Sequence, residues 1–186
     1  MITPQQLGLP ARFTHFRPQQ LNALTRALKT RCRFVGHAAP TGAGKSLIAM
    51  AQAAVLGLRA IYLTHTLPLQ TQLMADYCES GWVDIRGQVN YPCRLVEEDY
   101  SYRRFGPGCD LGPCHFHVNC GYRQLGCGYF DAYNLAKASN AVTNYAYWLS
   151  INAYGEGLGH APLLVCDEAH NIVDALTAHR AITISP

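Results

Sequence analysis

At 186 residues the chain is long enough for one globular core and a small insertion. Its apolar fraction of 49% is ordinary, and its net charge of +3 permits a nucleic-acid partner without requiring one. No apolar run approaches membrane-spanning length and the N-terminus lacks the layout of a signal peptide, so we expect no membrane partner and a reducing, cytoplasmic compartment.

The first predicted element is a helix that begins at Pro18, because Leu21, Leu24 and Leu28 then recur at helical spacing. Gln20 lies in its first turn, ahead of a nucleotide loop. Its amide both donates and accepts, so it could read an adenine edge. That signal is weak taken alone, since a surface Gln is the commoner case.

A phosphate-binding loop is predicted at residues 39–46, which read Ala-Pro-Thr-Gly-Ala-Gly-Lys-Ser. We expect a strand at 34–38 before it and a buried helix at 47–56 after it. Backbone N–H groups and the helix N-terminus would bind phosphates, Lys45 would reach the outer phosphates and Ser46 would hold Mg²⁺. A chance glycine turn is disfavoured by this context. The nucleotide-binding residues expected for ATP are Gln20, Thr41, Gly42, Ala43, Gly44, Lys45 and Ser46.

Alternating strands and helices follow the loop. Residues 60–63 read as a buried strand, and the next helix has Thr66 as its N-cap and Leu69, Leu73 and Tyr77 on one face. After residue 127 the pattern resumes with a helix, a strand at 141–143, a helical stretch at 145–151 and a buried strand at 163–166. This alternation predicts an α/β fold, a parallel sheet with helices on its faces.

Cysteines are concentrated where the pattern breaks. Of the eight, Cys32, Cys78 and Cys166 fall in segments that read as regular structure, and we expect inert buried thiols there. The other five lie within 35 residues: Cys93, Cys109, Cys114, Cys120 and Cys127. A segment without a core of its own needs a staple, which clustered thiolates supply through metal. We therefore divide the chain into residues 1–81, an insertion at 82–127, and residues 128–186.

An acidic pair ends the last strand. Asp167 and Glu168 lie at a strand's carboxyl end, where parallel sheets bind ligands. We assign Asp167 to Mg²⁺ and Glu168 to the base that polarises the attacking water. Helix capping is the alternative for an isolated pair. The expected catalytic set is Lys45, Asp167, Glu168 and His170.

These segments together resemble the motifs of superfamily 2 helicases. Residues 39–46 and 167–170 resemble motifs I and II, residues 64–73 resemble motif Ia, and residues 16–20 resemble an Arg-Pro-x-Gln entry. Within the superfamily the likeness is to the iron–sulfur DNA helicases of the XPD and DinG group. Residues 87–93 fit their Gly-x-x-x-Tyr-x-Cys pattern, residues 127–130 their Cys-Pro-Tyr/Phe-Phe pattern with Gly for Pro, and residues 143–144 their Thr-Asn.

The resemblance implies a RecA-like motor domain 1 interrupted by a 4Fe-4S insertion. It assigns the cluster to Cys93, Cys114, Cys120 and Cys127 and leaves Cys109 spare. Zinc is the alternative metal to iron–sulfur, because His115 and His117 lie beside Cys114 and Cys-His sites also bind zinc. The short Cys-x-x-Cys spacing that usually marks a zinc site is lacking here. It also implies DNA contacts, on single-stranded or forked DNA, from Thr64, Thr66, Gln72, Tyr91 and Asn144.

The implied activity is that of the ATP-binding lobe of a 5′-to-3′ DNA helicase, with a role in DNA repair and a prokaryotic or phage-like source. Residues 1–186 correspond to motor domain 1 of the resembled family, so we expect the arch domain and motor domain 2 to be absent from them. We therefore expect a fragment, or one half of a split helicase that works with a second chain supplying motor domain 2. The alternative is a catalytically incomplete nucleic-acid-binding or regulatory module.

Overall fold

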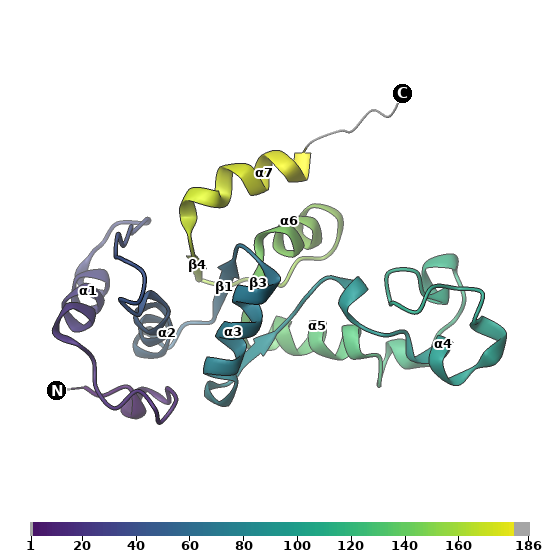
Figure 1. Cartoon of the computed structure of the whole chain (residues 1–186), viewed down its shortest axis with the longest axis horizontal. Coiled ribbons are helices and arrows are strands. Elements are labelled where there is room, and N and C mark those ends of the chain that lie inside the picture. The colour runs from purple at the N-terminus through teal and green to yellow at the C-terminus, as the bar shows by residue number, and fades with distance from the viewer. Residues whose placement is uncertain (1, 181–186) are drawn as a thin grey trace.

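The structure, a computed structural model, describes residues 2–180. Its centre is a four-stranded parallel sheet in the order β2-β3-β1-β4. The strands are β1 (Ala60–Thr64), β2 (Trp82–Asp84), β3 (Asn140–Asn144) and β4 (Leu163–Cys166). All five residues of β1 are buried, as expected of a central strand in a parallel sheet. The predicted parallel α/β architecture is confirmed (Figure 1).

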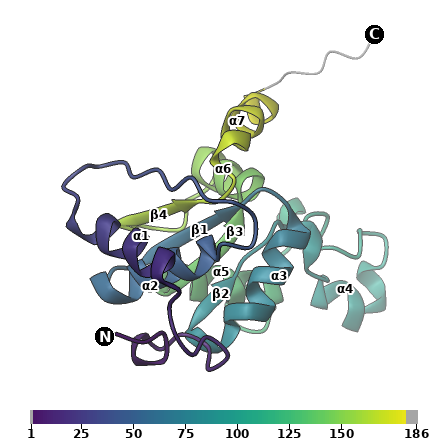
Figure 2. The ribbon, with the colours of Figure 1, turned by 60° about the vertical axis from the view of Figure 1, so that its left-hand side comes forward.

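Helices cover both faces of this sheet. They are α1 (Pro18–Lys29), α2 (Lys45–Leu56), α3 (Leu67–Tyr77), α4 (Arg94–Glu98), α5 (Gly128–Ala138), α6 (Tyr145–Tyr154) and α7 (Ile172–Arg180). Ala60 and Tyr62 of β1 pack in one apolar cluster with α1, α2 and α3, whereas Ile61 and Leu63 pack in a second cluster with α5 and α6. The two faces follow from the alternation of side chains along a strand. Figure 2 shows α1 and α3 on the near side of the sheet.

The predicted strand at 34–38 is absent. These residues are irregular and largely exposed, with Phe34 83% exposed, and they make no backbone hydrogen bond in the described structure. A strand is stable only beside a neighbour, and within residues 2–180 the outer edge of β4 has no partner strand. Cys32, just before this segment, is likewise exposed rather than buried.

The cysteine-rich segment forms a separate lobe beyond α5, at the right of Figure 1. Residues 82–84, the first three of the predicted insertion, form β2 and pair with β3. From Ile85 to Cys127 the described chain contains only short helical turns, α4 and one isolated antiparallel bridge between Pro92 and Gly108.

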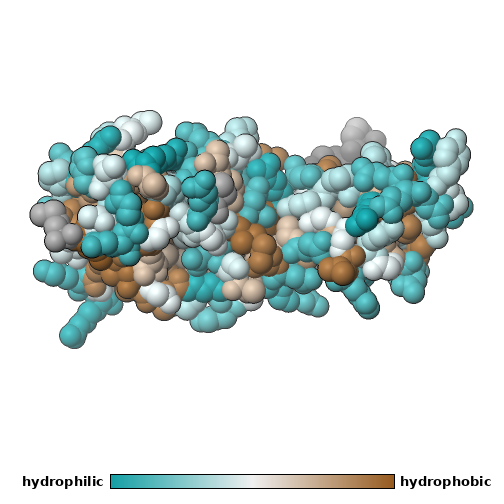
Figure 3. Space-filling model, turned by 90° about the horizontal axis from the view of Figure 1, so that it is seen from below, coloured by the Kyte–Doolittle hydropathy of each residue, from teal (hydrophilic) through white to brown (hydrophobic). Residues whose placement is uncertain are grey.

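The surface outside the core is mixed. On the face shown in Figure 3, apolar residues form separate small groups within a mostly hydrophilic surface. None of the helices in residues 2–180 is both long and apolar enough to span a bilayer.

Candidate nucleotide site and cysteine pocket

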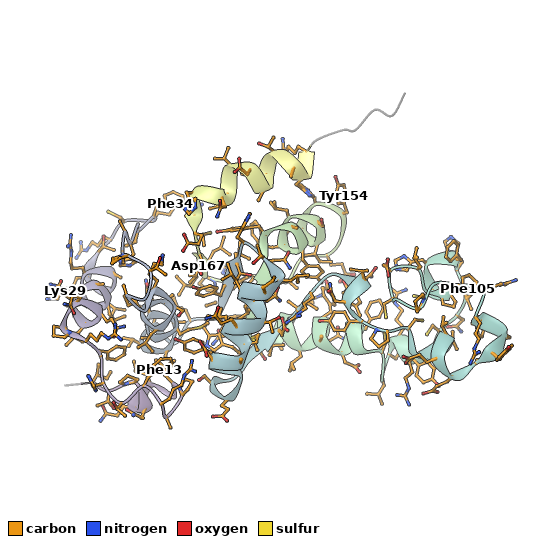
Figure 4. The ribbon with its side chains drawn as sticks, in the orientation of Figure 1. Phe13, Lys29, Phe34, Phe105, Tyr154 and Asp167 are labelled. Carbon is orange, nitrogen blue, oxygen red and sulfur yellow. The ribbon has the colours of Figure 1, made fainter. Side chains whose placement is uncertain are left out.

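The carboxyl edge of the sheet gathers the ends of three strands. Because β1, β3 and β4 run parallel, Thr64, Asn144 and Cys166 end at the same edge. Asp167 follows β4 and stays tied to β1, since its backbone N–H donates to the Leu63 carbonyl at 2.9 Å. The Tyr145 hydroxyl donates to the Asp167 carbonyl at 2.7 Å. Figure 4 shows Asp167 at this edge, far from Phe105 in the cysteine-rich lobe.

The phosphate loop reaches the same edge and turns directly into α2, which begins at Lys45. Gly42 and Gly44 both have φ near 79°, a left-handed conformation that side chains disfavour. The Ala43 N–H closes the turn by donating to the Pro40 carbonyl at 3.2 Å. The sequence therefore builds the tight turn that a phosphate cradle requires.

The start of α1 holds this loop from outside. The Gln20 amide donates to the Ala43 carbonyl at 2.9 Å and accepts from the Arg17 N–H at 2.9 Å. The Arg17 guanidinium donates to the Gly42 carbonyl at 3.2 Å. Gln20 is buried, and a Cβ on Gly44 would lie only 2.2 Å from its amide nitrogen. In this structure Gln20 therefore positions the loop, and its amide is already engaged by protein rather than presented to a base.

Lys45 meets the acidic pair across the edge. Its ammonium donates to Glu168 Oε1 at 2.9 Å, and both side chains are about one-third exposed. The hydrogen bond from Lys45, with its positive charge, lowers the pKa of Glu168 below its ordinary value. The two residues are 123 positions apart, and the fold of the parallel sheet brings them together.

Glu168 also has an unusual backbone. Its φ of 48° and ψ of 51° are left-handed, which among the described non-glycine residues occurs only here and at His117. Such a conformation costs about 1–2 kcal/mol and is concentrated at functional sites. The Glu168 N–H donates to Asp167 Oδ1 at 3.0 Å. The exposed His170 ring lies 3.5 Å from Glu168 Oε2.

Two buried tyrosines line the floor below these groups. Burial and the nearby Asp167 carboxylate raise the pKa of Tyr62, so it stays a neutral donor beside that acid. Burial raises the pKa of Tyr77 to about 12, with an opposing contribution from Ser46 beside its hydroxyl. Ser46, the expected Mg²⁺ ligand, is half-buried at the start of α2.

The residues expected to contact DNA divide into two groups. Thr66 and Gln72 are exposed at and near the start of α3. Thr64 is buried, with its hydroxyl donating to the carbonyls of Thr66 and Thr143. Asn144 caps α6 and is also buried, and the Tyr91 hydroxyl accepts from the Arg86 N–H. Thr64 and Asn144 therefore support the edge in this structure instead of presenting side chains to solvent, whereas Tyr91 is half-buried.

Gln70 has a structural role that we did not expect from the sequence. This fully buried amide donates to the carbonyls of Ile85 and Val142, at 3.0 and 3.3 Å, and to the Asp84 carboxylate. It accepts from the Asn144 amide at 3.1 Å. The network ties α3 to the ends of β2 and β3. Helical spacing contained the signal, since Gln70, Leu73 and Tyr77 share the buried face of α3, whereas Leu69, expected there, is exposed.

All five clustered cysteines line one pocket in the second lobe. Its walls include the aromatic rings of Tyr122, Tyr129 and Phe130, which shield the thiols from water. Cys109 Sγ lies 3.8 Å from Cys127 Sγ and donates to the Pro92 carbonyl at 3.3 Å. Cys127 is the N-cap residue of the 11-residue helix α5. Burial, followed by the neighbouring Cys127 thiol, raises the pKa of Cys109 to about 12.

The thiols of this pocket are suitable ligands for a thiophilic metal centre, but their arrangement does not indicate a particular metal. Among the described residues, no group of three or more His, Cys, Asp or Glu side chains is arranged to hold a metal ion. The Cys109–Cys127 separation is that of two donors on one tetrahedral ion, about 3.8 Å for Zn–S bonds of about 2.3 Å. His115 and His117 are exposed and do not line the pocket.

Arginines lie over aromatic rings around the same lobe. The closest stacks are Arg103 over Tyr100, at 4.2 Å to the ring centroid, and Arg94 over Tyr122, at 4.7 Å. Arg104 lies 5.0 Å from the Phe105 centroid. Tyr100 is 77% exposed, so its pairing with Arg103 leaves ring and charge available at the surface.

A parallel sheet, a glycine loop entering a helix, and a lysine meeting a strand-end acid define a phosphate-loop nucleotide-binding lobe. The comparison with protein-family models agrees: residues 13–185 match the family described as "Type III restriction enzyme, res subunit". The chain belongs to this family of helicase-like domains, and the matched region corresponds to the N-terminal lobe of superfamily 2 helicases. A search of curated proteins gave no match.

Proposed function

We propose that the chain is the ATP-binding and ATP-hydrolysing motor lobe of a DNA helicase of the XPD and DinG type. The observation that carries the proposal is the Lys45–Glu168 contact of 2.9 Å at the carboxyl edge of the sheet. A lysine reaching for phosphate and an acid poised for water belong within one site. Neither the glycine loop nor the acidic pair would be specific alone.

The contact suggests how the site is engaged. The terminal phosphates of ATP would compete with Glu168 for the Lys45 ammonium, since each is an anion within reach of the same donor. Phosphate binding then frees Glu168, whose pKa returns toward the ordinary carboxyl value once Lys45 no longer contacts it. An ordinary carboxyl group, with a pKa of about 4.3, is still ionised at neutral pH and able to accept a proton from water. Ser46 and Asp167 would hold Mg²⁺, which neutralises charge on the phosphates.

The second lobe supports the nucleic-acid part of the proposal. Exposed ring and guanidinium groups, such as Tyr100 and Arg103, suit stacking on bases and neutralising phosphates of a single strand. The five-thiol pocket suits a 4Fe-4S cluster, which takes four cysteines. Such a cluster would staple a lobe that has few regular elements of its own.

The test is ATP hydrolysis with and without single-stranded DNA, by the chain alone and with a second motor lobe added. We expect slow hydrolysis alone, stimulation by DNA, and a loss of about 10²–10⁴-fold in Glu168→Gln with nucleotide binding retained. Glu156→Gln, at an exposed acid paired with Lys137, is the matched control. If the chain binds nucleotide but its hydrolysis rate is unchanged by DNA, by Glu168→Gln and by the second lobe, it would instead be a regulatory module.

A further inference from the structure

The cysteine pocket contains five thiols, one more than a 4Fe-4S cluster or a zinc ion binds. One of them must therefore be spare. The positions of the thiols within the fold decide which one, because a ligand must be held where the other ligands converge.

Cys93 and Cys109 are fixed beside each other by the backbone. The Pro92–Gly108 bridge is flanked by two hydrogen bonds, from the Cys93 N–H to Pro107 O at 2.7 Å and from the Cys109 N–H to Tyr91 O at 2.9 Å. Both thiols are almost fully buried, with 6% and 5% exposure. This short ladder makes them a preorganised pair at the floor of the pocket.

Cys109 also reaches the opposite wall. Its sulfur lies 3.8 Å from that of Cys127, which is held at the start of α5 by the hydrogen bond from its N–H to Tyr122 O. Cys109 therefore contacts Cys127 through its sulfur and lies beside Cys93 through the backbone bridge. A metal centre bound by Cys93 and Cys127 would meet the Cys109 sulfur directly.

Cys120 is held less firmly. It is only partly buried and lies at the start of a three-residue turn, Gly121–Arg123. Its only backbone hydrogen bond outside regular elements is the one its carbonyl accepts from the Arg123 N–H. Cys114 is also partly buried, but it lies two residues after Gly112, whose backbone packs so closely on Cys93 that an added Cβ would lie 3.0 Å from the Cys93 sulfur.

We infer that the metal centre of this lobe is bound by Cys93, Cys109, Cys114 and Cys127, and that Cys120 is the spare thiol. The inference rests on the proposed function, which places a metal centre in this pocket. It reverses the roles that the helicase resemblance gives Cys109 and Cys120. On binding, each of the four thiols loses its proton to solvent and forms one metal–sulfur bond.

The experiment is anaerobic reconstitution of the whole chain with iron and sulfide, or with zinc, followed by metal and sulfide analysis. We expect about four irons per wild-type chain, a loss of at least fourfold in Cys109→Ser, and full retention in Cys120→Ser. Retention in Cys109→Ser, or loss in Cys120→Ser, would overturn the inference. Zinc without iron would refute the cluster but leave the ligand ranking readable on zinc, and a wild-type chain that binds neither metal would refute both.

A second pair of variants separates ligation from folding. Aspartate can replace a thiolate as a ligand, so Cys109→Asp should keep part of the metal and shift its visible or paramagnetic resonance spectrum. Cys120→Asp should leave that spectrum unchanged. An unshifted spectrum in Cys109→Asp would show that Cys109 acts only by packing.

Discussion

Replacing Gly44 tests how α1 holds the phosphate loop. An alanine there would place its Cβ 2.2 Å from the Gln20 amide nitrogen, in a backbone with φ of 79°. The left-handed conformation costs about 1–2 kcal/mol. Gln20 can move aside only by losing its hydrogen bonds to the Ala43 carbonyl and the Arg17 N–H, at about 1 kcal/mol each. Gly44→Ala should therefore lower the free energy of unfolding by roughly 3–4 kcal/mol.

Gly42→Ala is the matched control. It has the same φ and open space around the added Cβ, so it should cost only about 1–2 kcal/mol. Urea unfolding of both variants measures the difference. In the double variant Gln20→Ala/Gly44→Ala the clash is removed, and the two changes should cost about 2 kcal/mol less than their sum. Equal losses in the two glycine variants, or strictly additive losses in the double variant, would refute the reasoning.

Three further predictions concern the other contacts. Gln70→Ala removes the side-chain donor to the buried Ile85 carbonyl and the acceptor of the Asn144 amide, so its unfolding free energy should fall by about 2–4 kcal/mol. Exposed Gln72→Ala should change it by less than about 0.5 kcal/mol in the same urea assay, and equal effects would contradict the network. Lys45→Met should raise the pKa of Glu168 toward its ordinary value, as followed by carboxyl NMR. Because the pKa of Glu168 is lower in the folded state, the contact stabilises the wild type above about pH 4.5, and this stabilisation is lost as pH falls through the folded pKa. The same Glu168 pKa in Lys45→Met and in the wild type would exclude the contact in solution. Replacing both Arg103 and Arg104 with Ala should make the plot of log K against log salt for single-stranded DNA shallower by about 1.4, and an unchanged slope would remove this surface from the DNA path.

The sequence was sufficient for the architecture of the sheet because the strands of a parallel sheet are continuous apolar runs. The strands expected at 60–63, 141–143 and 163–166 became β1, β3 and β4 with shifts of at most one residue. The run at 34–38 also begins with apolar residues but contains Gly36 and His37, and it remains irregular. Strand formation depends on a neighbouring strand, which the composition of a segment does not reveal. β2, with three residues, is too short for periodicity to show.

The residues of the candidate site with recognisable motifs could be predicted from the sequence, but the polar side chains that hold those residues in place could not. The loop, Lys45 and the acidic pair carry recognisable patterns, and the strand order explains why they meet. A polar side chain that faces inward looks the same in a sequence as one that faces water. We therefore expected Gln20, Thr64 and Asn144 to contact ligands. In the structure, the side chains of all three make hydrogen bonds to backbone groups of the protein.

The cysteines show the same limit. Their clustering indicated a shared pocket, but the choice of ligands depends on which thiols the backbone brings together. The bridge between Pro92 and Gly108 joins segments that no periodicity marks. The likeness to the helicase family consequently favoured Cys120, whereas the backbone pairing with Cys93 and the contact with the Cys127 sulfur favour Cys109.

The central claim is that ATP binds where Lys45 meets Glu168, and calorimetric titration with MgATP tests it most directly. The wild-type chain and Lys137→Ala, which removes a comparable but remote ion pair with Glu156, should bind with equal affinity. Lys45→Ala should lose at least about tenfold in affinity, because a charge-assisted contact to phosphate is worth about 1.5–3 kcal/mol. Equal binding by Lys45→Ala and the wild type would contradict the account.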